Sequence, residues 1–314
     1  MTTNESVIDL KREVTPETVE AVEKLKRERN AVLLVHNYQI AEVQDLADYL
    51  GDSLGLSQQA AATDADVIVF CGVHFMAQTA KIVCPDKTVL MPDPGAGCPM
   101  ADMITAEALI EFKAEHPGVP VVTYVNSTAE VKAESDICCT SANSVRIVQS
   151  LDTDRVIFVP DHFLGTWTQE QLPDVEFILW GGFCPTHAKM TAEMVEQARA
   201  EHPDAVFICH PECRPEVTSI ADAVLSTGGM VRFAAETDAR EIIIGTEEGM
   251  AYRLKRENPD KEFHVLPGAV CPNMKKTTAD KVLASLENMQ FEIEVEPEIA
   301  ERARRAVERM LAVG

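Results

Sequence analysis

The sequence predicts an α/β protein built from three homologous three-layer αβα domains, with small parallel sheets arranged about a pseudo-threefold axis. Three observations predict this fold: apolar strand-like runs alternate with helical stretches, a polar triplet ends one run in each third of the chain, and a Cys-Pro pair recurs at nearly equal intervals. A length of 314 residues suits two or three small domains, and the 46% of apolar residues is enough to give each a core.

The first element of each repeat is an apolar run that ends in polar residues. Residues 31–35, 120–123 and 205–209 read AVLLV, PVVT and AVFIC. Such β-branched runs predict buried parallel strands that carry functional side chains at their C-terminal ends. The triplets that follow are His36-Asn37-Tyr38, Tyr124-Val125-Asn126 and His210-Pro211-Glu212.

A small hydroxyl residue follows the start of each triplet at the same interval of 17 residues, and a second strand comes after it. The hydroxyl residues are Ser53, Ser141 and Thr227, and each lies in a helix-start signal. We therefore expect three helix N-termini, which can bind carboxylate or phosphate groups through free N–H groups and the helix dipole. The second strands are expected in the runs DVIVFCG, RVIFVPD and EIIIGTE, at residues 66–72, 155–161 and 241–247.

The third strand of each repeat follows a Pro-Asp pair and leads to a cysteine. These cysteines are Cys98, Cys184 and Cys271, which are 86 and 87 residues apart, and each precedes a proline. Duplication of one β-α-β-α-β unit of about 86 residues explains every interval. We expect domains at residues 1–103, 104–189 and 190–314, with the N-terminal helix in the first domain and the C-terminal helix packed on that domain.

The carboxyl ends of parallel strands form the binding edge of such sheets, so the three domains should bring their cysteines together. Three thiolates suit a [4Fe-4S] cluster whose fourth iron stays open as a Lewis acid. A structural zinc site would normally have four protein ligands with close CxxC spacings, which the sequence lacks. The polar residues expected around the cysteines can bind carboxylates and move protons: His36, Tyr38, Tyr124, Asn126, His210 and Glu212.

Several other residues have no support from the repeats. His187 lies three residues after Cys184, and the pair Lys275-Lys276 follows Cys271. They either approach the same cavity or have ordinary structural roles. The adjacent Cys138 and Cys139 precede Ser141, and their roles are left open.

Charge and composition limit the partners. The net charge of -23 argues against nucleic acid or an anionic membrane, because both would repel the protein. The sequence has no apolar run near the ~18 residues of a spanning helix, and its first 30 residues do not resemble a secretory signal. We therefore expect a cytoplasmic protein. Its nine cysteines are then more naturally ligands, catalytic thiols or buried residues than disulfides.

Several long stretches carry a resemblance to a known family. They include HNYQIAEVQDLADYLGDSL, GVHFMAQTAKIVCPDKTVLMPDPGAGCPMAD, YVNSTAEVKAESDICCTSAN, GGFCPTHAKM, HPECRPEV and AVCPNMKKTT, and they extend from about residue 30 to residue 278. On these motifs the chain resembles the quinolinate synthases, the A proteins of NAD biosynthesis. Members of that family condense iminoaspartate with dihydroxyacetone phosphate to quinolinate, with loss of phosphate and water.

The resemblance also implies roles for individual residues. The oxygen-sensitive [4Fe-4S] cluster of the family has three cysteine ligands, which the motifs match to Cys98, Cys184 and Cys271. Tyr38 and Glu212, with His210, resemble the groups that move protons. The positions implied to bind the substrates are His36, Ser53, Tyr124, Asn126, Ser141, His210, Glu212 and Thr227. A possible partner is the enzyme that makes iminoaspartate. Some relatives carry a CxxCxxC string at the third ligand, but Cys271 stands alone, so no redox switch of that kind is expected.

Two other functions stay open at this point. One is a hydro-lyase that uses the same open cluster on another hydroxy acid. The other is a non-catalytic cluster or metal carrier, which would have little need for matched polar residues around the cysteines. Quinolinate formed from the two precursors without oxygen would distinguish the condensing enzyme from both.

Overall fold

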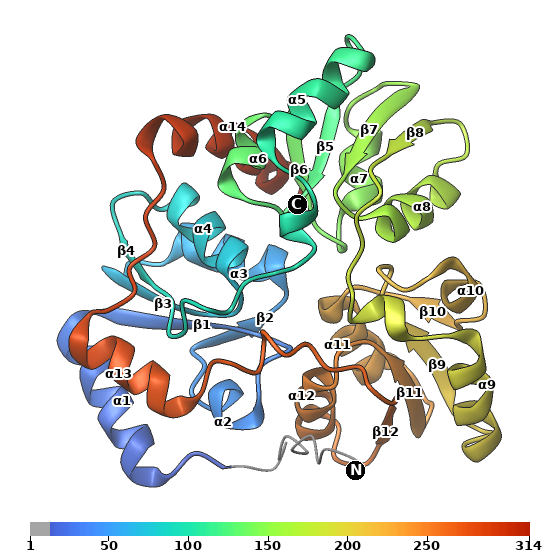
Figure 1. The fold of residues 1–314 in the computed structure, drawn as a ribbon. Helices are drawn as coiled ribbons and strands as arrows, with labels where there is room; N and C mark the ends of the chain where they lie inside the picture. Colours follow the sequence, from blue (N-terminus) through green and yellow to red (C-terminus); the bar gives the residue numbers. More distant parts are fainter. Residues whose placement is uncertain (1–12) are drawn as a thin grey trace, which may run out of the picture.

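Three αβα units surround a common centre in the computed structural model, which describes residues 13–314. Each unit has a four-stranded parallel sheet with helices on its faces (Figure 1). The predicted fold class is therefore confirmed. The expected lack of a secretory signal depends partly on residues 1–12, which lie outside the described residues. Among residues 13–314 no helix is long and apolar enough to cross a membrane.

The first unit has the sheet order β2-β1-β3-β4. Its elements are α1 (Pro16–Arg29), β1 (Ala31–His36), α2 (Ala41–Gln44), β2 (Tyr49–Gly51), α3 (Ser53–Ala62), β3 (Val67–Cys71), α4 (His74–Val83) and β4 (Thr88–Leu90). Helix α1 begins with a cap in which the Thr15 side chain accepts the backbone N–H of Thr18 at 3.2 Å, and Pro16 occupies its first position.

The second unit repeats this order as β6-β5-β7-β8. It contains α5 (Ala106–Glu115), β5 (Val121–Tyr124), α6 (Ala129–Ala133), β6 (Ile137–Cys139), α7 (Ser144–Gln149), β7 (Arg155–Val159), α8 (His162–Gln171) and β8 (Glu176–Leu179). The boundaries proposed from the sequence, after residues 103 and 189, coincide with the ends of two short helices, η1 (Ala101–Met103) and η2 (His187–Lys189).

The third unit has the order β10-β9-β11-β12. It contains α9 (Ala192–Glu201), β9 (Val206–Cys209), α10 (Pro215–Thr218), β10 (Ala223–Val224), α11 (Thr227–Glu236), β11 (Glu241–Gly245), α12 (Gly249–Glu257) and β12 (Glu262–Val265), and the chain then continues into α13 (Ala279–Asn288) and α14 (Pro297–Val313).

Each unit has one strand more than the sequence predicts. The additional strands, β2, β6 and β10, have only two or three residues, too few to show a hydrophobic period. An aspartate just before each of them accepts an N–H from the neighbouring first strand. These bonds join Asp48 to Leu33 at 2.8 Å, Asp136 to Val121 at 2.8 Å, and Asp222 to Phe207 at 2.7 Å.

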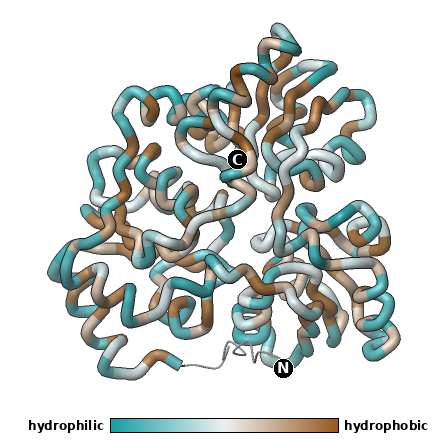
Figure 2. The backbone as a smooth tube through the Cα atoms, in the orientation of Figure 1, coloured by the Kyte–Doolittle hydropathy of each residue, from teal (hydrophilic) through white to brown (hydrophobic). Residues whose placement is uncertain are grey.

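The core of each unit lies where its helices cover the central strands. All five residues of β3 are buried, as are the last four of β7 and of β11. Figure 2 shows the same pattern: hydrophobic residues are concentrated in the strands, and hydrophilic residues lie on the outer helices. Strands buried on both faces explain why the sequence shows continuous apolar runs there.

The two C-terminal helices return to the first and second units. Helix α13 packs against α1 and β3. Helix α14 lies mainly against α6 and β6 of the second unit, and also against α4 of the first, so the expectation that it packs on the first domain is only partly met. The small residues of its buried face, such as Ala303 and Ala306, permit this close approach. Arg302 also pairs with Glu134 at 2.5 Å.

A buried lysine lies between the first two units, and we expect it to make folding stability depend on pH. Lys132 of α6 is fully buried, contacts the carbonyl of Ser127, and lies 5.6 Å from the ring centroid of Phe75 on α4. Burial lowers the pKa of Lys132 from 10.5 to about 8. Between these values the unfolded chain binds a proton that the folded chain does not, so the free energy of unfolding should rise with pH.

We expect Lys132→Met to remove this dependence. Between pH 7.5 and pH 10, wild type should gain on the order of 2–3 kcal/mol of unfolding free energy relative to the variant, since each pKa unit is worth about 1.36 kcal/mol. Urea denaturation of both proteins at the two pH values measures the difference. If wild type and variant differ in unfolding free energy by the same amount at both pH values, Lys132 keeps an ordinary lysine pKa.

Candidate functional site

One cavity of about 180 Å³ lies where the three units meet, and all the site residues predicted from the sequence line it. A water molecule takes about 30 Å³, so the cavity suits a small metabolite rather than a macromolecule. The predicted residues that line it are His36, Tyr38, Ser53, Cys98, Tyr124, Asn126, Ser141, Cys184, His210, Glu212, Thr227 and Cys271. Their proximity is a finding, whereas the role of each stays a prediction.

The strands explain this convergence. His36 ends β1, Tyr124 ends β5, and His210 directly follows β9. All sheets are parallel, so these residues lie at the carboxyl edge of each unit. The three cysteines follow β4, β8 and β12, which run in the same direction.

The three cysteines share an environment that the other six lack. Cys98, Cys184 and Cys271 are partly exposed, whereas the other free cysteines are buried. Backbone N–H groups two or three residues later face each sulfur and oppose the effect of burial on its pKa. These groups belong to Met100 and Ala101 at Cys98, His187 at Cys184, and Asn273 and Met274 at Cys271.

This donor set fits an iron–sulfur cluster. N–H groups directed at cysteine sulfurs are a usual way to stabilise and tune such clusters. Burial nevertheless raises the pKa of all three thiols, that of Cys98 to about 12. The thiols are therefore protonated until a cation replaces the protons, as expected of metal ligands.

Cys138 and Cys139 do not belong to this set. Both are fully buried in β6, neither lines the cavity, and burial raises the pKa of both thiols. They are core residues of the second unit.

His36 and His210 occupy equivalent positions and share one hydrogen-bond arrangement. The backbone N–H two residues later donates to Nδ1 of each ring, from Tyr38 at 3.2 Å and from Glu212 at 3.3 Å. Burial lowers the pKa of both imidazoles to about 3, so both are neutral and carry their proton on Nε2. Each ring can donate from Nε2, and that of His210 lies 3.1 Å from Ser141 Oγ.

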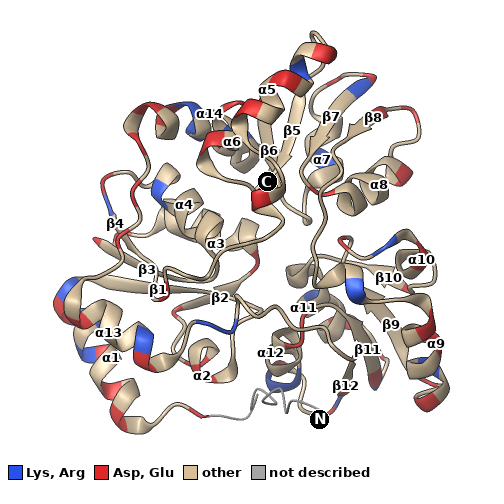
Figure 3. Ribbon diagram, in the orientation of Figure 1, with Lys and Arg blue, Asp and Glu red and all other residues tan. Residues whose placement is uncertain are grey.

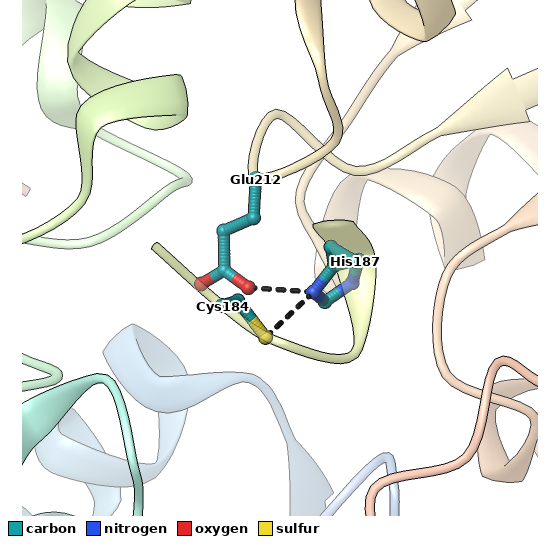
Figure 4. Close-up of side chains that lie close together, drawn as sticks. All are labelled: Cys184, His187 and Glu212. Carbon is teal, nitrogen blue, oxygen red and sulfur yellow. Dashed lines mark hydrogen bonds and ion pairs between the residues drawn. The ribbon is translucent and has the colours of Figure 1, made fainter. Parts of the chain in front are cut away.

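Glu212 is the central charged group of the cavity. Tyr124 donates its hydroxyl to Glu212 Oε1 at 2.6 Å, and Asn126 donates to the same oxygen at 3.4 Å. His187 Nδ1 lies 2.7 Å from Oε2 (Figure 4). Burial alone would raise the pKa of this carboxyl, but the neighbouring His187 and His210 and the hydrogen bonds from His187 and Tyr124 lower it to about 2. Glu212 is therefore a carboxylate at neutral pH.

His187, which the repeats do not support, is part of the site. Its Nδ1 lies 3.2 Å from Cys184 Sγ as well as beside Glu212 (Figure 4). These three residues form a group whose ligating atoms lie close enough to hold a metal ion. The ring also stacks on His210, with centroids 4.8 Å apart.

Thr246 links Tyr38 to His187, although no pattern in the sequence singles it out. Its Oγ1 lies 2.5 Å from the Tyr38 hydroxyl and 2.9 Å from His187 Nε2. Since Nδ1 of His187 faces a carboxylate, its proton belongs on that nitrogen, and Nε2 accepts from Thr246. The result is a continuous chain of hydrogen bonds from Tyr38 to Glu212. Burial raises the pKa of Tyr38 well above 10, so its phenol is protonated.

A buried ion pair supports the third cysteine. Lys275 pairs with Glu247 at 2.9 Å and donates to the carbonyl of Tyr38 at 2.9 Å. Glu247 accepts the backbone N–H of Cys271 at 3.0 Å. One member of the lysine pair thus joins the first and third units beside the cavity, whereas Lys276 lies outside it and contacts the carbonyl of Gly95.

Two of the three expected helix starts are correct. Ser53 and Thr227 are the first residues of α3 and α11, although their neighbours Asp52 and Ser226 form the caps. The prediction for Ser141 is wrong, because α7 begins three residues later, at Ser144. Asn143 Oδ1 accepts the backbone N–H of Thr140 at 2.8 Å, which makes a turn before that helix. Two helix N-termini, which are groups that can bind anions, therefore border the cavity. The Asp52 carboxylate caps α3 and faces Gly228 of α11.

The surface charge does not prevent anion binding at this centre. Most acidic residues lie along outer helices such as α1, α5 and α9 (Figure 3), and three of them, Asp52, Glu212 and Glu247, line the cavity. Within the cavity the imidazole Nε2–H groups and the two helix N-termini offer local donors. The carboxylate of Glu212 is already paired with the Tyr124 hydroxyl and His187.

Comparison with known proteins places the chain in a family. The family model described as quinolinate synthetase A protein matches residues 20–312. The chain belongs to this family. A quinolinate synthase from Dehalococcoides mccartyi (strain CBDB1) is 59% identical over 293 residues, which are 93% of this chain and 97% of that protein. One from Geobacter metallireducens is 56% identical over 93% of this chain and 96% of that protein. One from Thermodesulfovibrio yellowstonii is 52% identical over 94% of this chain and 98% of that protein.

Membership of the quinolinate synthetase A protein family confirms the resemblance identified in the sequence. It also identifies the chain as an enzyme, since these relatives are synthases matched over nearly their whole length. A carrier of metal or clusters without catalytic function is therefore not supported.

Proposed function

We propose that this chain condenses iminoaspartate with dihydroxyacetone phosphate to form quinolinate for NAD biosynthesis, with loss of phosphate and water. The observation that carries the proposal is the cavity that gathers, from each unit, one partly exposed cysteine and the first and third residues of one triplet. Near-complete matches to proteins named quinolinate synthase support it. We further propose that the reaction takes place in the cytoplasm, and that the enzyme that makes iminoaspartate supplies it, because water hydrolyses imines.

Cys98, Cys184 and Cys271 would hold a [4Fe-4S] cluster in this proposal. When bound, the cluster supplies an open iron that acts as a Lewis acid toward a hydroxyl or carboxylate oxygen during dehydration. The N–H groups that face the three sulfurs would offset part of the negative charge of the thiolates.

The substrates would be held by neutral donors. His36 and His210 carry their Nε2–H groups in the first and third units, and α3 and α11 begin at Ser53 and Thr227 beside the same cavity. Both substrates are anionic, one through carboxylates and one through its phosphate, and helix N-termini bind such groups. Thr227 Oγ1 is fixed by Asn37, which donates to it at 2.8 Å.

Proton transfer would use the two ends of the chain of hydrogen bonds. Glu212, a carboxylate, would accept a proton as the new carbon–carbon bond forms or the ring closes. Tyr38, a protonated phenol, would donate one to a leaving oxygen and recover it through Thr246 and His187. His210 lies next to Glu212, at 3.7 Å, and would assist either transfer.

Thr246→Val tests this relay at one atom. The substitution keeps the shape of the side chain and removes the hydroxyl that joins Tyr38 to His187. We expect kcat to fall about tenfold, with KM and iron content unchanged, because binding groups and cysteines are untouched. Steady-state kinetics under anaerobic conditions give both constants. Unchanged kcat would mean that Tyr38 exchanges its proton by another route.

The function itself is tested by an anaerobic assay of the cluster-loaded protein. Iminoaspartate and dihydroxyacetone phosphate are supplied together, and quinolinate is measured by chromatography. Quinolinate and phosphate should form in equal amounts, and omission of either precursor should abolish both. A protein that holds its cluster but forms no quinolinate, while it dehydrates other hydroxy acids, would instead be the hydro-lyase considered above.

A further inference from the structure

A second group of metal-ligating side chains lies far from the cavity, on the outer part of the third unit. His202 follows the last residue of α9, Glu241 begins β11, and His264 lies within β12. The amino end of β11 is at the opposite edge of the sheet from the cavity, which lies at the carboxyl ends. Figure 1 shows these three elements in the third unit. No step of the proposed reaction uses them.

The ligand atoms of this group lie close together. His202 Nδ1 and His264 Nε2 lie 3.3 Å and 3.2 Å from the same oxygen, Glu241 Oε2. The three ligand atoms all lie within 4.8 Å of one another. A zinc ion bound at about 2.0–2.1 Å places neighbouring ligand atoms about 3.3 Å apart, so two of the three edges are already at that length. The two imidazoles stack, with centroids 3.5 Å apart, so one ring has to turn before both nitrogen lone pairs point at the same ion.

The surroundings also favour a cation. All three side chains are partly exposed, between 22% and 36%, so an ion can reach them and keep a water ligand. Glu201 lines the same surface hollow as the two histidines. Glu262 is the residue paired with Glu241 in the β-ladder.

The second unit shows that the fold does not require these residues. The positions 86 residues earlier are His116, Arg155 and Ile178. There Arg155 pairs with Glu176 at 2.9 Å, and His116 packs edge-on against Phe112 with centroids 5.2 Å apart. The equivalent of His202 alone is thus retained, while the other two ligands occur only in the third unit.

We propose that His202, Glu241 and His264 bind a divalent transition-metal ion with a preference for imidazole and carboxylate ligands, for which Zn²⁺ is the probe. Two imidazoles and one carboxylate form a recognised zinc ligand set that leaves one position for water. The bound ion would fasten the end of α9 to β11 and β12 and stabilise the third unit.

The test is Zn²⁺ binding to the cluster-loaded protein, measured by equilibrium dialysis without oxygen and by metal analysis. Wild type should bind one Zn²⁺ more than the H202A/H264A double variant. Each single substitution, and Glu241→Gln, should weaken binding at least tenfold. The matched control is His116→Ala, which should bind as wild type. All these variants keep nine cysteines, so a difference between them cannot come from thiolates.

A second measurement separates binding from folding. Zn²⁺ should raise the melting temperature of wild type and of H116A but not that of the double variant, whose melting temperature without zinc should be close to that of wild type. Equal zinc content in wild type and double variant would overturn the proposal. So would a double variant that folds normally and retains the zinc-dependent rise.

Discussion

We expect Cys98→Ala to abolish quinolinate formation although the chain still folds. The side chain is partly exposed at the cavity, so its loss leaves no large void in the core. Two thiolates from the other units cannot hold a cubane cluster that needs three. We expect little iron or sulfide in the purified protein and no quinolinate above background. Iron and sulfide analysis, an absorption spectrum and the anaerobic assay measure these outcomes.

Cys71→Ala is the matched control. Cys71 is a buried residue of β3 in the same unit and has no equivalent in the threefold pattern. This variant should retain its cluster and its activity. Cys184→Ala and Cys271→Ala should behave like Cys98→Ala. Full activity in any one of these three would remove that cysteine from the ligand set.

The second large effect is expected for Glu212→Gln. The amide keeps the size of the side chain but cannot act as a base. Its NH₂ group also places one donor against another, either the Tyr124 hydroxyl or His187 Nδ1–H. We expect kcat to fall at least a hundredfold, within the usual range for loss of a general base. Iron content should stay that of wild type. Steady-state kinetics and iron analysis of the same preparation check both.

Glu216→Gln serves as the control for this prediction. Glu216 lies four residues further on, in α10, with a half-exposed side chain whose nearest cationic group is Arg214 at 3.9 Å. Its kcat should equal that of wild type. If Glu212→Gln also keeps a wild-type kcat, the carboxylate serves only to orient His187 and Tyr124, and the base must be another group.

The repeat intervals predicted the arrangement of the units because equal intervals indicate that the backbone follows the same path in each unit. A strand end, a helix start and a Cys-Pro pair recur at fixed distances only if each third of the chain follows the same path. That path was enough to bring His36, Tyr124 and His210 to one cavity. The same logic failed for the strands of two or three residues, since so short a segment carries no period of its own. The recurring aspartates Asp48, Asp136 and Asp222 were their only signal.

Residues that occur in only one unit could not be predicted by comparing units. His187 and Thr246 belong to the site through contacts between units, and such contacts depend on docking rather than on local pattern. The position of α14 has the same explanation: its small apolar face fits either unit, and packing against both α4 and α6 decided the outcome. Of Lys275 and Lys276, only the three-dimensional structure distinguishes the buried one.

Because the three units belong to one chain, equivalent positions in the cavity can carry different side chains. Three separate copies of one unit around a true threefold axis would also supply three thiolates, but every other side chain would then appear three times. In a single chain the positions equivalent to His36 are Tyr124 and His210, and those equivalent to Tyr38 are Asn126 and Glu212. The cavity is therefore symmetric in its sulfurs and asymmetric in its acids, bases and amides, as a pair of unlike reactants requires.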